Sequence, residues 1–188
     1  MADRFYLARF KNAHEFGLDG SGYGTYEQAL AEVKAGHKTS HWMWYIFPQI
    51  AGFGHSHNTK FYAIKSKEEA QAYLEDEVLG PRIREICEAL LTLETNDPAE
   101  VFGFPDWMKL GSSMTLFDDV CPNNVFGQVL DKLYDGKRDL ITSLFISNER
   151  GEEEEEDDST GILIDVLRDD YKEEDDDLLE KISVQNKN

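Results

Sequence analysis

The sequence predicts an all-α fold: a compact, irregular bundle of short helices, followed by a mostly disordered acidic tail. Apolar residues recur at helical spacing through most of the first 148 residues. No Asn-Gly or Asp-Gly hairpin turn separates segments of alternating polarity, so strands are not indicated. A run of acidic residues, 152–158, begins the tail.

Capping boxes begin two of the predicted helices, residues 26–35 and 67–75. In each, a hydroxyl residue, Thr25 or Ser66, precedes Gln or Glu by three positions, so each side chain can bond the other's backbone N–H. Gly36 follows the first helix, where a left-handed residue commonly ends a helix.

Proline and the apolar spacing locate the later helices. Pro81 is predicted to be the first residue of the helix with the clearest apolar stripe, formed by Ile83, Ile86, Cys87, Leu90 and Leu91. A short helix is predicted over residues 97–102, where Asp precedes Pro. The last two predicted helices span residues 124–134 and 139–146.

The charge divides the chain of 188 residues into two predicted parts. Residues 149–188 hold 17 acidic and 5 basic side chains, a net charge of −12, whereas the whole chain has −19, which leaves −7 for residues 1–148. Like charges repel one another and stay hydrated. We therefore expect a helical domain over residues 1–148 and a largely disordered acidic tail over residues 149–188.

The composition excludes several classes of protein. So acidic a chain does not suit a nucleic acid or an anionic membrane, because both are bound through clustered Lys and Arg. Two cysteines, Cys87 and Cys121, do not form a disulfide framework. No signal peptide or membrane-spanning segment is recognisable. The expected location is the cytoplasm, or also the nucleus in a eukaryotic host.

The densest aromatic segment spans residues 40–49, with four aromatic side chains in six residues. One interpretation places Trp42, Tyr45 and Ile46 on the core face of a helix that ends at Pro48. The other uses the segment as the aromatic wall of a ligand pocket.

Polar residues at the ends of this segment favour the pocket. His41 and Gln49 flank an apolar stretch, and each needs a hydrogen-bond partner if buried. Lys38 and Ser40 stand just before the segment, where they could bind an anion at a helix N-terminus.

A second polar segment spans residues 109–117 and carries the hydroxyls of Ser112, Ser113 and Thr115 after Lys109. Hydroxyls in an apolar helix are costly if they lack partners. They either bond back to helical carbonyl groups or point, with the lysine, into a polar pocket. The segment lacks the closing glycine of a nucleophile elbow.

Neither a metal nor a cofactor is predicted. His41, His55 and His57 have no intervening acid and no recognised ligand spacing, and the latter two are expected in a glycine-bearing loop. The glycine-rich residues 20–24 do not match a dinucleotide fingerprint and are interpreted as a flexible connection.

Together these segments resemble the domain of unknown function 1810 family over residues 2–147. The resemblance rests on four motifs, in order: residues 40–49, 52–56, 79–82 and 102–117. It implies a small, mostly helical domain without an established reaction, so no catalytic residue carries over. The chain has His55 where the family usually has Arg, residues 20–24 look like an insertion, and the tail lies outside the family.

The leading hypothesis is a domain that binds a small polar or nucleotide-like ligand in one pocket. The residues predicted to contact the ligand are Lys38, Ser40, His41, Trp42, Trp44, Gln49, Arg82, Lys109, Ser112, Ser113 and Thr115.

Two alternatives stay open. The first is a hydrolase-type enzyme in which His41 is the general base, for instance beside Ser113. The second is a protein-interaction module that acts through the tail and binds a basic partner. Its apolar island resembles a small-ubiquitin-like-modifier interaction motif, unless it docks on the domain itself. The island consists of Ile162, Leu163, Ile164, Val166 and Leu167.

Overall fold

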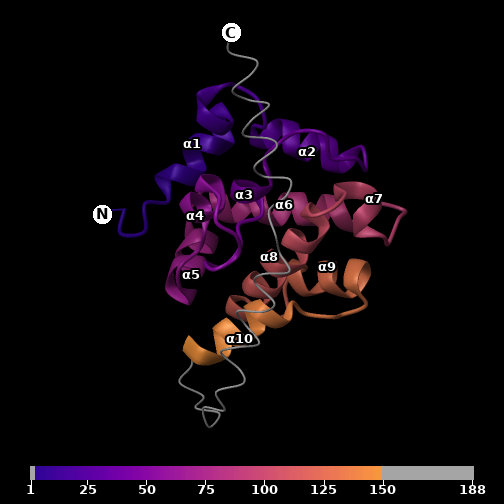
Figure 1. Ribbon diagram of the computed structural model, residues 1–188. Helices are drawn as coiled ribbons and strands as arrows, with labels where there is room; N and C mark the ends of the chain where they lie inside the picture. The colour runs from indigo at the N-terminus through magenta and orange to yellow at the C-terminus, as the bar shows by residue number, and fades with distance from the viewer. Residues whose placement is uncertain (1–2, 150–188) are drawn as a thin grey trace.

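The computed structural model describes residues 3–149, which form ten α-helices and one 3₁₀ helix (Figure 1). In chain order the elements are α1 (Ala8–Phe16), η1 (Leu18–Gly20), α2 (Tyr26–Lys34), α3 (Met43–Ile46), α4 (His57–Tyr62), α5 (Lys67–Glu75), α6 (Leu79–Leu91), α7 (Pro98–Phe102), α8 (Asp106–Val120), α9 (Val125–Tyr134) and α10 (Leu140–Glu149). The all-α prediction is confirmed: within residues 3–149 the only β-type pairing is an isolated bridge between Ile50 and Ile64.

The predicted caps are present. Thr25 and Ser66 each accept a hydrogen bond from the backbone N–H three positions later, so α2 and α5 begin where the capping boxes indicate. Asp97 caps α7 with Pro98 as its first residue, and Asn124 caps α9. Local chemistry therefore determines these four starts.

The predicted start of α6 is wrong by two residues, because the helix begins at Leu79 and not at Pro81. The carboxylate of Asp76 accepts hydrogen bonds from the N–H groups of Val78 and Leu79, at 3.0 and 3.1 Å, and so supports an earlier first turn. Pro81 still falls within the first turn, where a helix needs no N–H donor.

The prediction of a loop at His55 and His57 is also partly wrong. Ser56 accepts from the N–H of Thr59 and caps α4, so His57 is the first residue of a helix. The glycines before Ser56 indicated a loop, so Ser56 was not predicted as a cap. Neither α4 nor α1 is among the helices predicted from the sequence.

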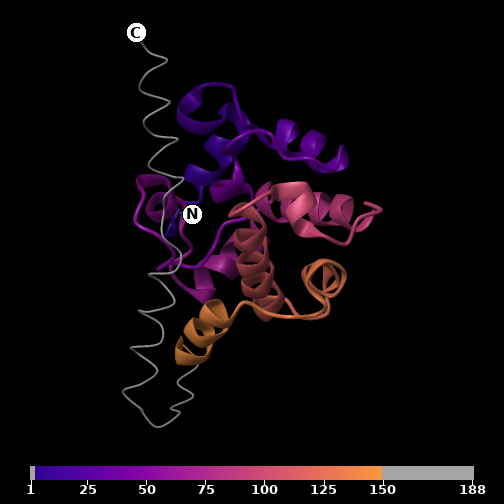
Figure 2. The ribbon, with the colours of Figure 1, turned by 45° about the vertical axis from the view of Figure 1, so that its right-hand side comes forward.

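Helix α8 is the centre of the bundle. It contacts α5, α7, α9 and α10, and α6 contacts α2, α5 and α9. Figure 2 shows α8 near the middle of the molecule, with the orange helices α9 and α10 around its lower end. The residues buried on α8 include the apolar Leu110, Met114, Leu116 and Phe117 and the hydroxyl-bearing Ser112, Ser113 and Thr115.

A chain of aromatic rings connects helices that are distant in sequence. The ring centroids of Phe10 and Tyr73 lie 5.1 Å apart, those of Tyr73 and Phe117 5.4 Å, and those of Phe117 and Phe126 5.5 Å. All four side chains are fully buried. They belong to α1, α5, α8 and α9, so this contact holds the first helix on the later ones.

The last described helix, α10, ends at Glu149, and Asp139 caps it by accepting from the N–H of Thr142 at 2.8 Å. The tail and its apolar island, residues 162–167, lie outside the described residues, so the domain boundary and the tail's interaction stay predictions. Within residues 3–149, none of the helices combines the length and the apolar character needed to cross a bilayer.

We expect Phe117→Ala to lower the free energy of unfolding by about 3–5 kcal/mol, because it leaves a cavity between two buried rings. Urea denaturation measures the change. Phe16→Ala is the matched control, since Phe16 is 58% exposed at the end of α1 and its removal should cost no more than about 0.5 kcal/mol. Equal losses in both variants would contradict the packing described.

Candidate functional site

Glu32 on α2 fixes the chain just before α3. Its carboxylate accepts hydrogen bonds from the backbone N–H groups of Thr39 and Ser40 at 2.8 and 3.0 Å, from both hydroxyls of these residues, and from the indole N–H of Trp42 at 2.8 Å. Burial opposes ionisation, but these donors outweigh it and lower the pKa of Glu32 to about 2. Ser40 and Trp42, both predicted as ligand contacts, thus hold their own segment in place.

Two of the predicted segments meet at Asp106, the first residue of α8. The ammonium groups of Lys38 and Lys109 lie 2.6 and 3.2 Å from its two carboxylate oxygens. Lys38 also lies 5.1 Å from the ring centre of Trp42, and Lys109 lies 5.2 Å from that of Trp44. These five residues are called the lysine–tryptophan cluster below.

The cluster carries more positive than negative charge among its own members. Burial alone would raise the pKa of Asp106, but Lys109 and Lys38 hold that pKa below its ordinary value, so the carboxylate stays ionised. Two ammonium groups therefore share one carboxylate, and their side chains are only 9% and 14% exposed. Asp106 was missed in the sequence, although an acid three residues before Lys109 on a helix is a pairing signal.

The serines of α8 lie one turn beyond the cluster. Ser112 and Ser113 are three and four positions after Lys109, so they share its side of the helix. Both are fully buried, and neither hydroxyl has a hydrogen-bond partner within the described residues. Among the same residues, the indole nitrogen of Trp44 and the side-chain nitrogen of Gln49 are likewise buried without a partner.

Three other predicted residues, Thr115, Arg82 and His41, are not part of the lysine–tryptophan cluster. Thr115 donates to the carbonyl of Gly111 at 2.8 Å and accepts from the N–H of Asp139 at 2.9 Å, which is the back-bonding alternative. Arg82 lies 4.9 Å from the ring centre of Tyr26.

His41 is exposed, and its carbonyl accepts from the hydroxyl of Tyr45 at 3.0 Å. Because the hydroxyl of Ser113 has no partner, the hydrogen bond expected for a Ser113–His41 pair is not formed.

A cavity of about 660 Å³ lies between the segment that leads into α1, helix α4 and the start of α5. It is called the N-terminal cavity. Its lining residues are Arg4, Phe5, Tyr6, Arg9, His57, Lys60, Phe61, Lys65, Ser66 and Glu69.

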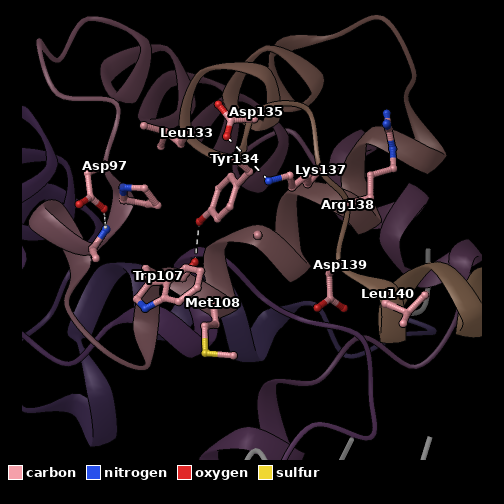
Figure 3. Close-up of a pocket in the computed structure, with 13 residues that line it drawn as sticks. Asp97, Trp107, Met108, Leu133, Tyr134, Asp135, Lys137, Arg138, Asp139 and Leu140 are labelled. Atoms are coloured by element: carbon pink, nitrogen blue, oxygen red, sulfur yellow. Dashed lines mark hydrogen bonds and ion pairs between the residues drawn. The ribbon is translucent and has the colours of Figure 1, made fainter. Parts of the chain in front are cut away.

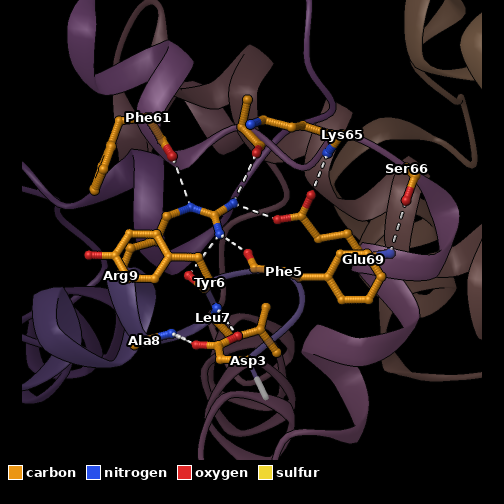
Figure 4. A network of polar contacts seen from close by, with 11 residues as sticks. Asp3, Phe5, Tyr6, Leu7, Ala8, Arg9, Phe61, Lys65, Ser66 and Glu69 are labelled. Atoms are coloured by element: carbon orange, nitrogen blue, oxygen red, sulfur yellow. Dashed lines mark hydrogen bonds and ion pairs between the residues drawn. The ribbon is translucent and has the colours of Figure 1, made fainter.

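A buried ion pair forms the inner wall of this cavity (Figure 4). Arg9 lies 2.5 Å from Glu69, and their side chains are only 5% and 4% exposed. The other carboxylate oxygen of Glu69 accepts from the N–H of Lys65 at 2.8 Å. The remaining guanidinium bonds go to the backbone carbonyls of Phe5, Tyr6, Phe61 and Ala63.

A smaller cavity of about 490 Å³ lies between α7, α8 and the α9–α10 connection (Figure 3). The hydroxyl of Tyr134 donates to the carbonyl of Trp107 at 2.5 Å, and Lys137 lies 3.9 Å from Asp135. The cavity is lined by charges of both signs, with three acidic side chains, Asp97, Asp135 and Asp139, and two basic ones, Lys137 and Arg138. Neither cavity is lined by a residue that the sequence predicted for the site.

Known proteins place the chain in a family. A family model described as "Protein of unknown function (DUF1810)" matches residues 4–146. The chain belongs to the DUF1810 family. The resemblance predicted from the sequence motifs is therefore confirmed.

A solved crystal structure has a similar fold. The crystal structure of the conserved hypothetical protein Rv1873 from Mycobacterium tuberculosis is 39% identical to this chain, with a TM-score of 0.71. The similarity covers 77% of this chain and 99% of the other. The comparison with curated proteins found no match. Membership of the DUF1810 family therefore supports the fold and assigns no activity.

Within residues 3–149, no group of three or more His, Cys, Asp or Glu side chains is arranged to hold a metal ion. Both cysteines are free thiols, with Cys87 buried and Cys121 half-buried.

We expect the Glu32 carboxylate to stabilise the fold above its ordinary pKa of 4.5, and this stability to be lost as the pH falls towards about 2. The folded-state pKa is depressed, so the unfolded chain binds more protons in this window and protonation favours unfolding. Glu32→Gln should therefore reduce the fall in urea midpoint between about pH 5 and about pH 3.

The control is Glu27→Gln, on the exposed side of the same helix. Other carboxylates titrate in this range in every variant. The quantity compared is therefore the slope of the urea midpoint against pH in the two variants. A slope for Glu32→Gln equal to that of the wild type would contradict the anchoring role.

Proposed function

We propose that this DUF1810 domain binds a small polar anion at the lysine–tryptophan cluster. The observation that carries the proposal is the meeting of two distant segments at Asp106, where two partly buried ammonium groups share one carboxylate. Among the cluster's own five residues this arrangement leaves one positive charge for a ligand to neutralise, and the ionised Glu32 carboxylate, which adjoins the cluster at Trp42, is occupied by its own donors. Charge-assisted hydrogen bonds to carboxylate or phosphate are about twice as strong as neutral ones.

Unpartnered donors from the same two segments support the proposal. Trp44 and Gln49 each bury an N–H donor without an acceptor, and Ser112 and Ser113 bury hydroxyls without one. Buried polar groups are nearly always paired with protein, water or ligand. A ligand rich in acceptor oxygens would provide hydrogen-bond acceptors for these donors, and water molecules would do so in its absence.

The indole rings indicate what else the ligand could contain. Trp44 is half-buried, and its ring centre lies 5.2 Å from the Lys109 ammonium group. A planar group on the ligand could stack there while its anionic group contacts the lysines. Carboxylates and phosphate esters, including nucleotide-like compounds, combine these features.

The first test is titration of the full chain with inorganic phosphate, acetate and adenosine monophosphate, followed by tryptophan fluorescence and thermal shift. Lys109→Gln should weaken binding about tenfold, because it removes a charge-assisted contact. Asp106→Asn should strengthen binding, because it removes the competing carboxylate. Opposite effects of the two variants are difficult to explain by a general loss of structure.

The control is Lys67→Gln. Lys67 is ion-paired with Asp119 at 2.6 Å and is 23% exposed, so it resembles Lys109 in setting but lies outside the cluster. Binding should be unchanged in this variant. If no probe binds at millimolar concentration, or if Lys109→Gln binds as the wild type does, the proposal fails.

The enzymatic alternative is tested on any ligand that binds. Turnover that is unchanged in His41→Ala, or binding without turnover, would argue against a catalytic role for His41.

A further inference from the structure

The N-terminal cavity is a cationic site on a strongly acidic protein. Besides the Arg9–Glu69 pair, its lining carries Arg4, Lys60 and Lys65, and none of these three makes an ion pair with a described residue. All three are exposed. The lining residues alone thus carry three more cations than anions, in a chain whose net charge is −19. Glu68 lies nearby, and the pKa of its carboxyl group is lowered by a hydrogen bond from its own backbone N–H and also by the charge of Arg4.

The Arg9–Glu69 pair does not neutralise the charges of Arg4, Lys60 and Lys65. The two side chains neutralise each other, and their remaining hydrogen-bonding groups are occupied by backbone atoms (Figure 4). They form a rigid inner wall. The three outer cations therefore determine the sign of the charge that a ligand meets.

Aromatic rings form the other part of the lining. Tyr6 is 55% exposed and Phe61 38%, and their rings meet edge to face at 6.3 Å. His57 stacks on Phe61 at 5.7 Å with the planes 13° apart. Exposed aromatic side chains grouped beside a cavity are typical of binding surfaces.

The turn that presents Tyr6 is held in an unusual conformation. Tyr6 has a φ of +52°, in the left-handed region that non-glycine residues rarely adopt. Arg9 secures this turn by donating to the carbonyls of Phe5 and Tyr6 at 2.6 and 2.9 Å. Asp3 secures it from the other side by accepting from the N–H of Leu7 at 2.7 Å. The aromatic wall is thus ordered before any ligand arrives, which reduces the entropic cost of binding.

We propose that the N-terminal cavity binds an anion that carries an aromatic ring, of the nucleoside monophosphate class. The ring packs against Tyr6 and Phe61, and the phosphate contacts Lys60 and Lys65. A volume of about 660 Å³ lies in the range of sites for ligands of this size. The site is separate from the lysine–tryptophan cluster, with which it shares no residue.

The experiment titrates the full chain with adenosine monophosphate, adenosine and inorganic phosphate by calorimetry. The monophosphate should bind more tightly than either fragment, because it alone contacts both the rings and the lysines. The double variant Lys60→Gln/Lys65→Gln should lose about tenfold in affinity for the monophosphate and should show a weaker salt dependence.

Matched controls separate the site from general effects. Tyr6→Ala should weaken binding several-fold, whereas Tyr23→Ala should not, although Tyr23 is equally exposed at 56%. Lys34→Gln/Lys137→Gln removes two exposed lysines elsewhere on the protein and should leave the affinity unchanged. Tm without ligand shows whether each variant is folded.

The acidic tail of the same chain is the other possible occupant. Changing the acids of residues 152–158 to their amides in the full chain tests this. Tighter monophosphate binding in that variant would show competition for the cavity and would support its preference for anions.

Absence of monophosphate binding in both chains would overturn the proposal. So would monophosphate binding that responds to Lys109→Gln but not to Lys60→Gln/Lys65→Gln, which would leave only the lysine–tryptophan cluster as a site.

Discussion

The close approach of α8 and α9 is the constraint on which the rest of the bundle depends. A Cβ atom at Gly111 would lie 3.1 Å from the ring of Tyr134, and one at Gly127 would lie 2.7 Å from the carboxylate of Asp118. A side chain at either position would force the Tyr134 ring or the Asp118 carboxylate to shift. Helix α9 packs closely on one side of α8, and α5, α7 and α10 also contact α8. The first turn of α8 places Lys109 beside Trp44.

Short helices are joined by long connections. Two charged side chains, Glu32 and Arg9, form hydrogen bonds with backbone N–H and carbonyl groups in these connections. Glu32 accepts from the N–H groups of Thr39 and Ser40. Arg9 donates to the carbonyl groups of Phe5 and Tyr6, just before α1, and to those of Phe61 and Ala63 at the end of α4. An anion thus holds one set of loops through their donors, and a cation holds another through their acceptors. Backbone groups that are buried in a loop need such partners because no neighbouring strand supplies them. The two groups are therefore structural in the first instance, and both candidate sites are built on loops that they fix.

Local signals in the sequence predicted much of the fold, and contacts between distant segments determined the rest. Caps at Thr25, Ser66 and Asp97 are local, and the helices they predict are present. The start of α6 was misplaced because Asp76 bonds a turn that no simple capping pattern indicates. The sequence singled out the residues around Trp42 and Lys109, but Asp106 as their meeting point depends on how α8 packs. The N-terminal cavity was not predicted, because neither α1 nor α4 was, and no local pattern in the sequence indicates that Arg9 is buried beside Glu69, 60 residues further along the chain.

Charge sets a condition on any anion that binds this protein. The net charge of the chain repels an approaching anion, and near 0.1 M salt this repulsion is largely screened beyond the Debye length of about 10 Å. Close to the lysines the sign reverses, and salt weakens the attraction. Binding free energy must therefore come from short-range contacts. An aromatic group is well suited to this, since stacking on Trp44, or on Tyr6 and Phe61, is not opposed by long-range charge. Both sites place cations beside exposed or half-buried aromatic rings. This arrangement suits a protein in which the binding free energy of an anion must come from short-range contacts.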